Sequence, residues 1–104
     1  MYIPLHTRGA IDRYVLQGIP TGDFMYNVLS NDLSGAVAHA DEQNSIYLVN
    51  IVKFIYNYVP QCCHGSRETI AKWLKAHKEK APRVEQAKTF YNTRLEQVGP
   101  QPDD

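Results

Sequence analysis

The chain has 104 residues, with 11 basic and 11 acidic side chains and a formal net charge of zero. A hydrophobic fraction of 43% is sufficient for a core, so the composition excludes a disordered chain, and the neutral balance gives no overall attraction to nucleic acid or anionic lipid. We therefore expect a single helical domain over residues 1–98, followed by a terminal tail at residues 99–104.

The first predicted helix follows an extended arm at residues 1–6. Thr7 is a natural N-cap for a helix over residues 8–17, and Gly18 is expected to end it. The side chains expected on its buried side are Ile11, Tyr14 and Val15.

A second helix is predicted over residues 22–40. Its apolar residues recur at helical spacing and form one continuous side. They are Phe24, Met25, Val28, Leu29, Leu33, Ala36 and Ala40.

The segment over residues 44–59 is the most apolar part of the chain and is predicted to be a central helix. Its polar residues Asn50, Lys53 and Asn57 fall within about 60° of one another on a helix, whereas a strand would not place them on one face. Pro60 is expected to end this helix. Because the rest of its circumference is apolar, we expect neighbouring elements to cover it from several sides.

Two further helices are predicted in the C-terminal third. Ser66 is a plausible N-cap for a helix that ends near Lys80 and buries Trp73. Pro82 suits the first turn of a helix that continues to Val98. Alternatively, the two segments form one long helix that is kinked at Pro82.

Together these elements predict an all-α fold, a compact bundle of four to five helices around the central apolar helix. The expected core residues are Leu29, Leu33, Ile51, Phe54, Ile55 and Trp73. Because the apolar surface of the central helix exceeds what the other helices can cover, we also predict a homo-oligomer. Its interface is expected to involve Tyr56, Tyr58 or the helix that carries Tyr91 and Leu95.

The cluster Cys62-Cys63-His64 is a candidate for metal binding or catalysis. A closed zinc site needs four ligands, and the sequence has no second Cys pair and no His pair at i, i+4. A catalytic Cys–His pair also needs an orienting third group, and no phosphate-binding glycine loop is present. We therefore expect no metal, no cofactor and no enzymatic activity, with two reduced thiols in a reducing compartment.

Asp32 is unusual because it falls on the apolar side of the predicted second helix. One interpretation is structural, with Asp32 in a salt bridge to Arg13 or Arg8, or as the N-cap of a neighbouring helix. The other is a polar slot, floored by Gly35, that receives a small ligand. The predicted ligand-binding residues of this slot are Arg8, Arg13, Tyr14, Asn31, Asp32 and His39.

Basic side chains gather near the C-terminus, where residues 66–96 carry eight Lys or Arg and four acidic residues. Charge pairs between neighbouring turns explain most of this pattern, and a chain with no excess positive charge lacks the usual footprint of a nucleic-acid partner. A nucleic-acid-binding regulator that uses these C-terminal helices is kept as the alternative function.

Two short motifs occur in the first half of the chain: I-P-x-H-T-R-x-A-x-D-R-Y-V at residues 3–15 and V-L-S-N-D-L at residues 28–33. With these motifs the chain resembles small uncharacterised proteins of tailed bacteriophages and prophages. The resemblance covers residues 3–77, while His64 and the extension beyond Lys80 depart from it. It implies a phage accessory protein, but no known reaction.

We therefore predict a non-enzymatic phage accessory protein that acts by binding in the host cytoplasm. By analogy with other small helical phage proteins, it would counter host immunity by sequestering a nucleotide-type signal or by occluding a host protein. No membrane partner is expected, because no signal peptide opens the chain and no apolar run approaches the length of a membrane span.

Overall fold

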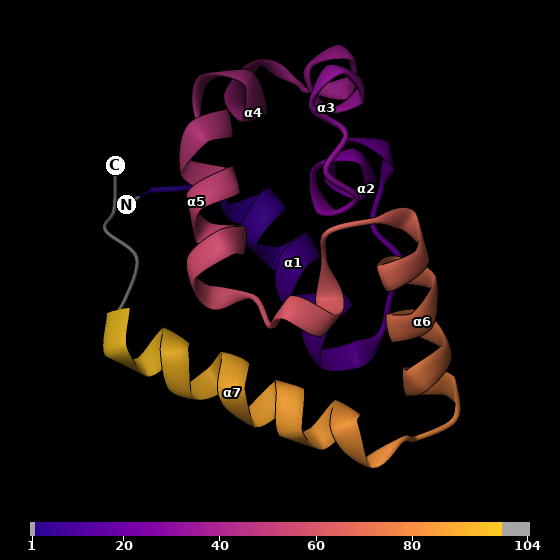
Figure 1. Cartoon of the computed structure of the whole chain (residues 1–104). Helices are drawn as coiled ribbons and strands as arrows, with labels where there is room; N and C mark the ends of the chain where they lie inside the picture. Colours follow the sequence, from indigo (N-terminus) through magenta and orange to yellow (C-terminus); the bar gives the residue numbers. More distant parts are fainter. Residues whose placement is uncertain (1, 99–104) are drawn as a thin grey trace.

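The computed structural model describes residues 2–98, which form seven α-helices and one short 3-10 helix (Figure 1). In chain order these are α1 (Leu5–Gln17), α2 (Asp23–Leu29), α3 (Leu33–His39), α4 (Glu42–Ile46), α5 (Leu48–Tyr58), η1 (Gln61–Cys63), α6 (Arg67–Lys78) and α7 (Pro82–Val98). The predicted all-α class is confirmed. The helices outnumber the expected four to five because two predicted helices are divided, and the predicted tail at 99–104 lies outside the described residues.

Helix α1 begins earlier than predicted. Pro4 is its N-cap, and the Pro4 carbonyl accepts a hydrogen bond from the Arg8 amide (2.9 Å). A helix can begin directly after Pro4, because proline restricts the backbone of the residue before it but not of the residue after it. Thr7 therefore lies inside the helix instead of capping it, and its hydroxyl donates to the side-chain oxygen of the buried Asn44. The predicted end of the helix is confirmed, since Gly18 has a left-handed φ of 68°.

The helix predicted over residues 22–40 is interrupted at residues 30–32. Asn31 ends α2 in a left-handed conformation with a φ of 66°, which Asn tolerates better than most residues. The carboxylate of Asp32 then accepts a hydrogen bond from the Gly35 amide (2.9 Å) and begins α3. Because α3 starts anew at this point, Leu33 is 68% exposed, and its predicted place in the core is wrong.

The predicted central helix is also divided, with a break at Tyr47 between α4 and α5. As predicted, α5 ends before Pro60. However, α5 is covered along one side, through Ile51, Phe54 and Ile55, and leaves other apolar residues in solvent. The expectation that neighbours surround this segment is therefore wrong.

The two C-terminal helices are separate, as one of the two alternatives predicted. The Ser66 hydroxyl accepts a hydrogen bond from the Thr69 amide (3.1 Å) and caps α6. Lys80 has a left-handed φ of 53° just after α6, and Pro82 begins α7. Figure 1 shows α7 running along one side of the molecule, where it contacts α1, α5 and α6.

The core lies where α1, α5, α6 and α7 meet, and α2 covers one end of it. Trp73 is buried there, and its indole Nε1 donates to the Tyr14 carbonyl (3.1 Å). The predicted core positions of Leu29, Ile51, Phe54, Ile55 and Trp73 are confirmed. The radius of gyration of 13.1 Å is close to the roughly 13 Å of a compact 100-residue domain.

Candidate functional site

The two arginines of the predicted slot are held elsewhere along α1. Arg8 forms an ion pair with Asp12, with 3.1 Å between Nε and Oδ1, and its guanidinium lies 5.0 Å from the centre of the Phe54 ring. Arg13 folds back along the helix, so that its guanidinium lies over Gly9. Neither arginine forms an ion pair with Asp32 within residues 2–98.

Tyr14 belongs to the core rather than to a ligand slot. Its hydroxyl donates to the backbone carbonyl of Cys63 (2.8 Å), which ties α1 to η1. Burial raises the pKa of Tyr14, so the hydroxyl stays protonated and remains a donor. The prediction that Tyr14 and Asp32 line one ligand slot is therefore wrong.

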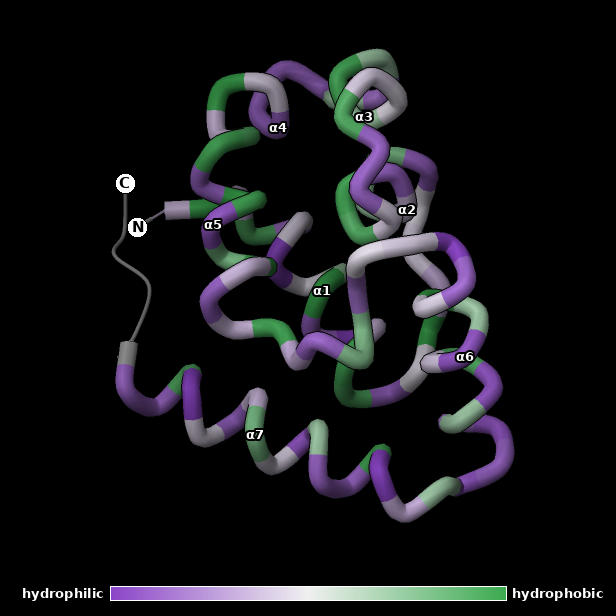
Figure 2. Tube along the Cα trace, in the orientation of Figure 1, coloured by the Kyte–Doolittle hydropathy of each residue, from purple (hydrophilic) through white to green (hydrophobic). Residues whose placement is uncertain are grey.

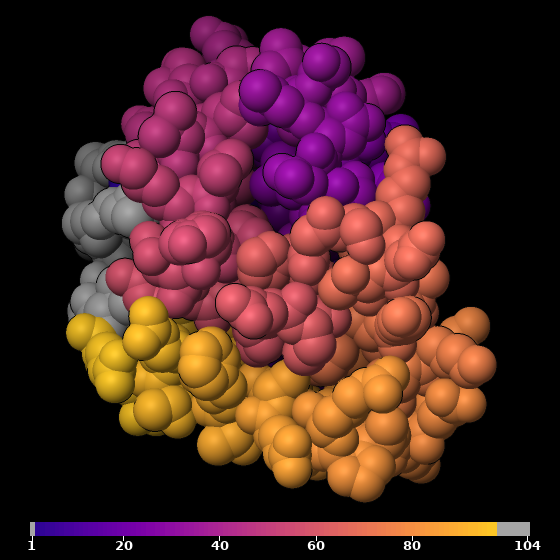
Figure 3. All heavy atoms as spheres, viewed as in Figure 1, coloured from indigo at the N-terminus to yellow at the C-terminus, as the bar shows by residue number. Residues whose placement is uncertain are grey.

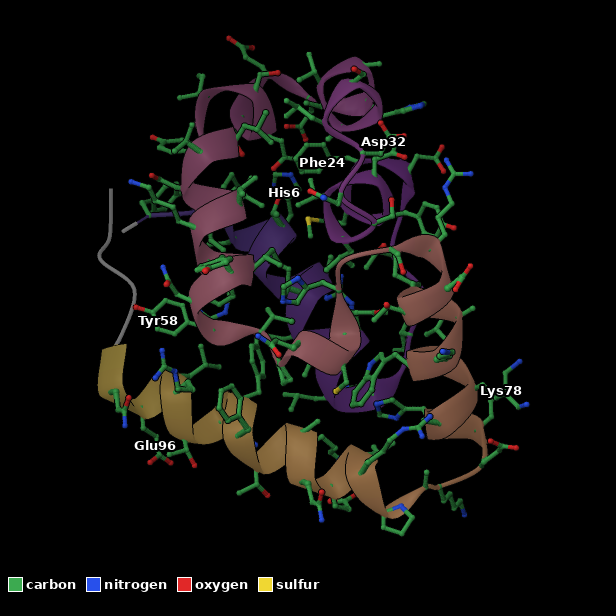
Figure 4. The ribbon with its side chains drawn as sticks, viewed as in Figure 1. His6, Phe24, Asp32, Tyr58, Lys78 and Glu96 are labelled. Carbon is green, nitrogen blue, oxygen red and sulfur yellow. The ribbon has the colours of Figure 1, made fainter. Side chains whose placement is uncertain are left out.

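Asp32 lies at the junction of α2 and α3, on the side that faces the start of α6 (Figure 4). Its Oδ2 is 3.8 Å from Nη2 of Arg67, so the predicted salt bridge to Arg13 or Arg8 is wrong, whereas an N-capping role is confirmed. Gly35 lies directly beneath the carboxylate, and a Cβ added there would come within 2.7 Å of Oδ2. The side chain of Asp32 itself therefore occupies the space that was predicted to receive a ligand.

We expect Asp32→Asn to change the free energy of unfolding by less than about 0.5 kcal/mol. Asn is as good an N-cap as Asp, and the exposed ion pair with Arg67 contributes little. Asp32→Ala removes the acceptor for the Gly35 amide and should cost about 1 kcal/mol. Urea denaturation of both variants, with Arg67→Gln as the control, checks this. Equal losses for Asn and Ala would show that the charge of Asp32 matters more than its capping bond.

His39, the last of the six predicted residues, lines a different pocket of about 210 Å³, which it shares with His6, Asp23 and Asp41. Figure 4 shows His6 beside Phe24, which lines the same pocket. His6 Nε2 is 3.0 Å from Oδ2 of Asp41, and a hydrogen bond from the Asn44 amide lowers the pKa of Asp41. Because two carboxylates line this pocket, it does not suit the phosphate of a nucleotide.

Six of the nine exposed large apolar side chains among the described residues lie on α3, α4 and α5. On α5 these residues are spaced three or four positions apart and form one stripe, Ile46 lies at the end of α4 just before it, and on α3 they are four positions apart. Their exposed fractions range from 44% for Val52 to 81% for Tyr56. We call this set the apolar face: Leu33, Val37, Ile46, Val49, Val52 and Tyr56.

A groove crosses the apolar face between α5 and the pair α2–α3, which lie side by side in Figure 3. It consists of two hollows of about 260 and 310 Å³ that share Val28, Asn31 and Val52. Ala36, Leu48 and Ile55 line it further along its length. Asn31 and Asp32 both line this groove, whereas His39 lines the separate pocket described above.

One end of the groove is closed by His64 and Gly65. Burial lowers the pKa of His64, so the ring is neutral, and Nε2 is buried without a hydrogen-bond partner among the described residues. A buried nitrogen without a partner is costly unless a polar group reaches it.

The segments around the groove are poor in charge. Lys53 is the one charged side chain in residues 43–66, and α3 contains no Lys, Arg, Asp or Glu. Figure 2 shows the contrast between the hydrophobic stretches of α3 and α5 and the repeated hydrophilic positions of α6 and α7. A surface that combines exposed apolar residues with so few charges is typical of an interaction site.

The adjacent thiols after α5 are free and differ in their surroundings. Cys62 is exposed, and a hydrogen bond from the Cys63 thiol, with Arg83 nearby, lowers the pKa of Cys62 to about 7. Cys63 is buried, and its pKa is raised by the interaction with Cys62 and by burial. Within residues 2–98, no three His, Cys, Asp or Glu side chains come together to hold a metal ion.

Uncovered apolar surface on the central segment was predicted from the sequence, with Tyr56 as an interface candidate, but the contribution of Leu33 and Val37 on α3 was not. The sequence signal for this exposed surface is the near absence of charged residues over 43–66. This stretch contains more apolar residues than one side of a helix needs for its contact with the core. The position of α3 could not be anticipated, because the break at Asn31 was not predicted.

Comparisons with protein-family models, with curated proteins and with solved structures gave no match for this chain. Among the described helices, none is both long enough and apolar enough to cross a lipid bilayer.

Proposed function

We propose that this is a non-enzymatic phage accessory protein that occludes a host protein by binding it through the apolar face. The observation that carries the proposal is the cluster of exposed apolar side chains beside a groove of matching character. The resemblance of residues 3–77 to small phage proteins supports the phage origin.

The form of the groove favours an amphipathic helix of the partner as its occupant. The two hollows lie in line between α5 and α2–α3, as a helix-in-groove interaction requires. Val52 lies between the two hollows, because it lines both, and would contact the middle of the bound helix.

Charge complementarity specifies the occupant further. Lys53 is exposed next to Val52, and α3 and α5 carry no acidic residue that could pair with it. A partner helix with an Asp or Glu beside its apolar residues would pair with Lys53. A second copy of the same face would bring Glu42 of α4 and Asp32, which lines the groove and already interacts with the Gly35 amide and Arg67. Lys53 thus selects a partner with an acidic residue, and the test below distinguishes a different protein from a second copy.

Of the four residues named for the interface of the predicted homo-oligomer, Tyr56 has an exposed side chain. Tyr56 is 81% exposed, whereas Tyr91 is fully buried. Tyr58 packs on Phe54 with 5.2 Å between ring centres, and Leu95 packs against the core. Self-association would therefore use Tyr56 on the apolar face or the exposed side of α7, where Phe90 is 49% exposed, and it is one outcome of the test below.

The alternative function, a nucleic-acid-binding regulator, rests on one observation. Neighbouring acids were expected to pair with the C-terminal basic residues, but among the described residues the pairs found are Lys88–Glu85 and Arg67–Asp32. Among the described residues, six basic side chains are left without a carboxylate within 4.0 Å: Lys72, Lys75, Lys78, Lys80, Arg83 and Arg94. We rank this function second because the net charge of zero weakens any attraction to phosphate.

Site-specific photo-crosslinking in bacterial cells tests the proposed function. A photoreactive amino acid is placed at position 37 or 49 on the apolar face, and at position 86 on α7 as an exposed control. We expect one discrete adduct from positions 37 and 49 that survives nuclease treatment and is absent from position 86. Mass spectrometry should locate the adduct on an amphipathic helix that carries an acidic residue.

A pair of charge variants completes the test. Val37→Lys with Val49→Lys should abolish the adduct formed from position 52, because docking would bury two unpaired lysines at a cost of several kcal/mol. Both positions are exposed, so folding should be nearly unchanged. The matched control, Gln86→Lys with Asn92→Lys on exposed positions of α7, adds the same charge and should retain the adduct. An adduct of the protein with itself, or adducts lost after nuclease treatment, would overturn the proposal.

A further inference from the structure

A further pocket lies between the end of α5, the following segment and α7. Its volume is about 330 Å³, and it is lined by Tyr56, Asn57, Val59, Pro60, Gln61 and Phe90. Figure 1 shows this end of α5 and the start of η1 lying next to α7. The volume is at the lower end of the range of about 300–1,000 Å³ for small-molecule sites. The pocket is thus large enough for one small planar ligand.

Two exposed aromatic rings border this pocket. Tyr56 on α5 is 81% exposed and Phe90 on α7 is 49% exposed. Phe90 stands out because the neighbouring Tyr91 is fully buried, so α7 carries one aromatic residue in the core and one in solvent. Exposed aromatic faces are the surfaces on which nucleobases stack.

Two residues with side-chain amides, Asn57 and Gln61, line the same pocket as the aromatic rings. Both residues are exposed, and within residues 2–98 neither amide makes a side-chain hydrogen bond. Each amide offers two N–H donors and one carbonyl acceptor. Together they can recognise the edge of a purine, which presents donors and acceptors side by side.

A cation without an acidic partner lies beside the pocket. Arg94 Nη2 donates to the backbone carbonyl of Asn57 (2.9 Å), and the guanidinium lies 5.9 Å from the centre of the Phe90 ring and 5.8 Å from that of Tyr58. No carboxylate of the described residues lies within 4.0 Å of it, and Nε is buried without a hydrogen-bond partner. Figure 4 shows Glu96 pointing away from Tyr58, so this acid does not neutralise Arg94.

We infer that this pocket binds a purine mononucleotide. The base stacks on Phe90 and Tyr56, the amides of Asn57 and Gln61 bind its edge, and Arg94 attracts the phosphate. Proline-rich peptides also bind between exposed aromatic residues, but they would leave the two amides and the charge of Arg94 unused. The pocket shares Tyr56 with the apolar face, but Phe90 and Arg94 on α7 are not part of that face, so variants of these two residues test the inference separately from the proposed function.

The test is an NMR titration of the full chain, labelled with nitrogen-15, with AMP, GMP, adenosine and a proline decapeptide. Each ligand is added to about 1 mM, where even weak binding is detected. We expect AMP or GMP to shift the amide signals of residues 56–61 and 90–94. Phe90→Leu keeps an apolar side chain but loses the ring, and should weaken nucleotide binding by about tenfold or more. Gln86→Ala, on an exposed position of the same helix, should leave it unchanged.

Arg94→Gln separates the phosphate contact from the base contacts. It should weaken AMP binding by about tenfold and leave adenosine binding unchanged, because adenosine has no phosphate. Thermal melting of each variant confirms that it is folded. The inference is overturned if no nucleotide shifts these signals, if the decapeptide shifts them and the nucleotides do not, or if AMP acts on the lysines of α6 instead. The crosslinking result at positions 37 and 49 is unaffected by any of these outcomes.

Discussion

Replacing Trp73 by alanine is expected to lower the free energy of unfolding by about 3–5 kcal/mol. The indole is 1% exposed, it contacts the edge of His77 with 4.8 Å between ring centres, and its Nε1 donates to the Tyr14 carbonyl. The substitution leaves a cavity between α1 and α6 that the short helices around it cannot fill. Since a domain of this size shifts its melting temperature by about 4–8 °C per kcal/mol, the variant should melt far below the native protein.

Trp73→Phe is the control for this prediction. It keeps most of the buried volume but removes the indole N–H, so it should cost less than Trp73→Ala. The Tyr14 carbonyl would not be left without a donor, because it also accepts the Gly18 amide (3.1 Å). Urea denaturation monitored by circular dichroism measures both variants. A loss below about 1 kcal/mol for Trp73→Ala would show that Trp73 does not hold α1 and α6 together.

Much of the fold could be predicted from local chemistry, because most signals for helix ends act over a few residues. Gly18, Pro60, Ser66 and Pro82 each impose or permit one backbone conformation, and the helix ends lie beside all four. The buried positions of Ile51 and Trp73 followed from helical periodicity in the same way.

The two divided helices could not be predicted from apolar periodicity alone. The apolar pattern continues through Asn31 and Tyr47, so it gives no sign of a break. The break at Asn31 depends on the capping hydrogen bond that Asp32 accepts from the Gly35 amide. This bond competes with the backbone conformation that would continue α2. Asp32 on the apolar side had two interpretations, a ligand contact or a structural role that included an N-cap, and it caps a new helix.

The candidate site was harder to predict, because it depends on which surfaces the tertiary structure leaves uncovered. The six residues proposed from the sequence included Tyr14, which is a core residue, and Arg13, which lies over Gly9. The apolar face has the same residue types as a core and differs from it in exposure alone. Periodicity can show that Val49 is on an apolar side of its helix, but not whether another helix covers that side.

We expect Gly18→Ala to lower the free energy of unfolding, although it adds a single methyl group. Gly18 ends α1 with a φ of 68°, a conformation that costs other residues about 1–2 kcal/mol. A Cβ added there would lie 2.5 Å from Cγ of His77 and 2.6 Å from its Cβ. His77 cannot move away easily, because its ring hydrogen-bonds the Val15 carbonyl (3.1 Å) and contacts Trp73. We therefore expect Gly18→Ala to cost about 2–4 kcal/mol of the free energy of unfolding.

A double-mutant cycle with His77→Ala separates the two causes of this loss. If the overlap with His77 dominates, Gly18→Ala in the His77→Ala background should cost the backbone strain alone, about 1–2 kcal/mol, with a coupling energy of about 1–2 kcal/mol. Gly9→Ala is the control, because Gly9 lies inside α1 and its added Cβ would meet the flexible end of Arg13, so this change should be neutral or stabilising by up to about 1 kcal/mol. Urea denaturation of the four proteins of the cycle gives the coupling directly. A coupling near zero would assign the whole cost to the left-handed backbone, and the close approach of α1 to His77 would then contribute nothing to the requirement for glycine.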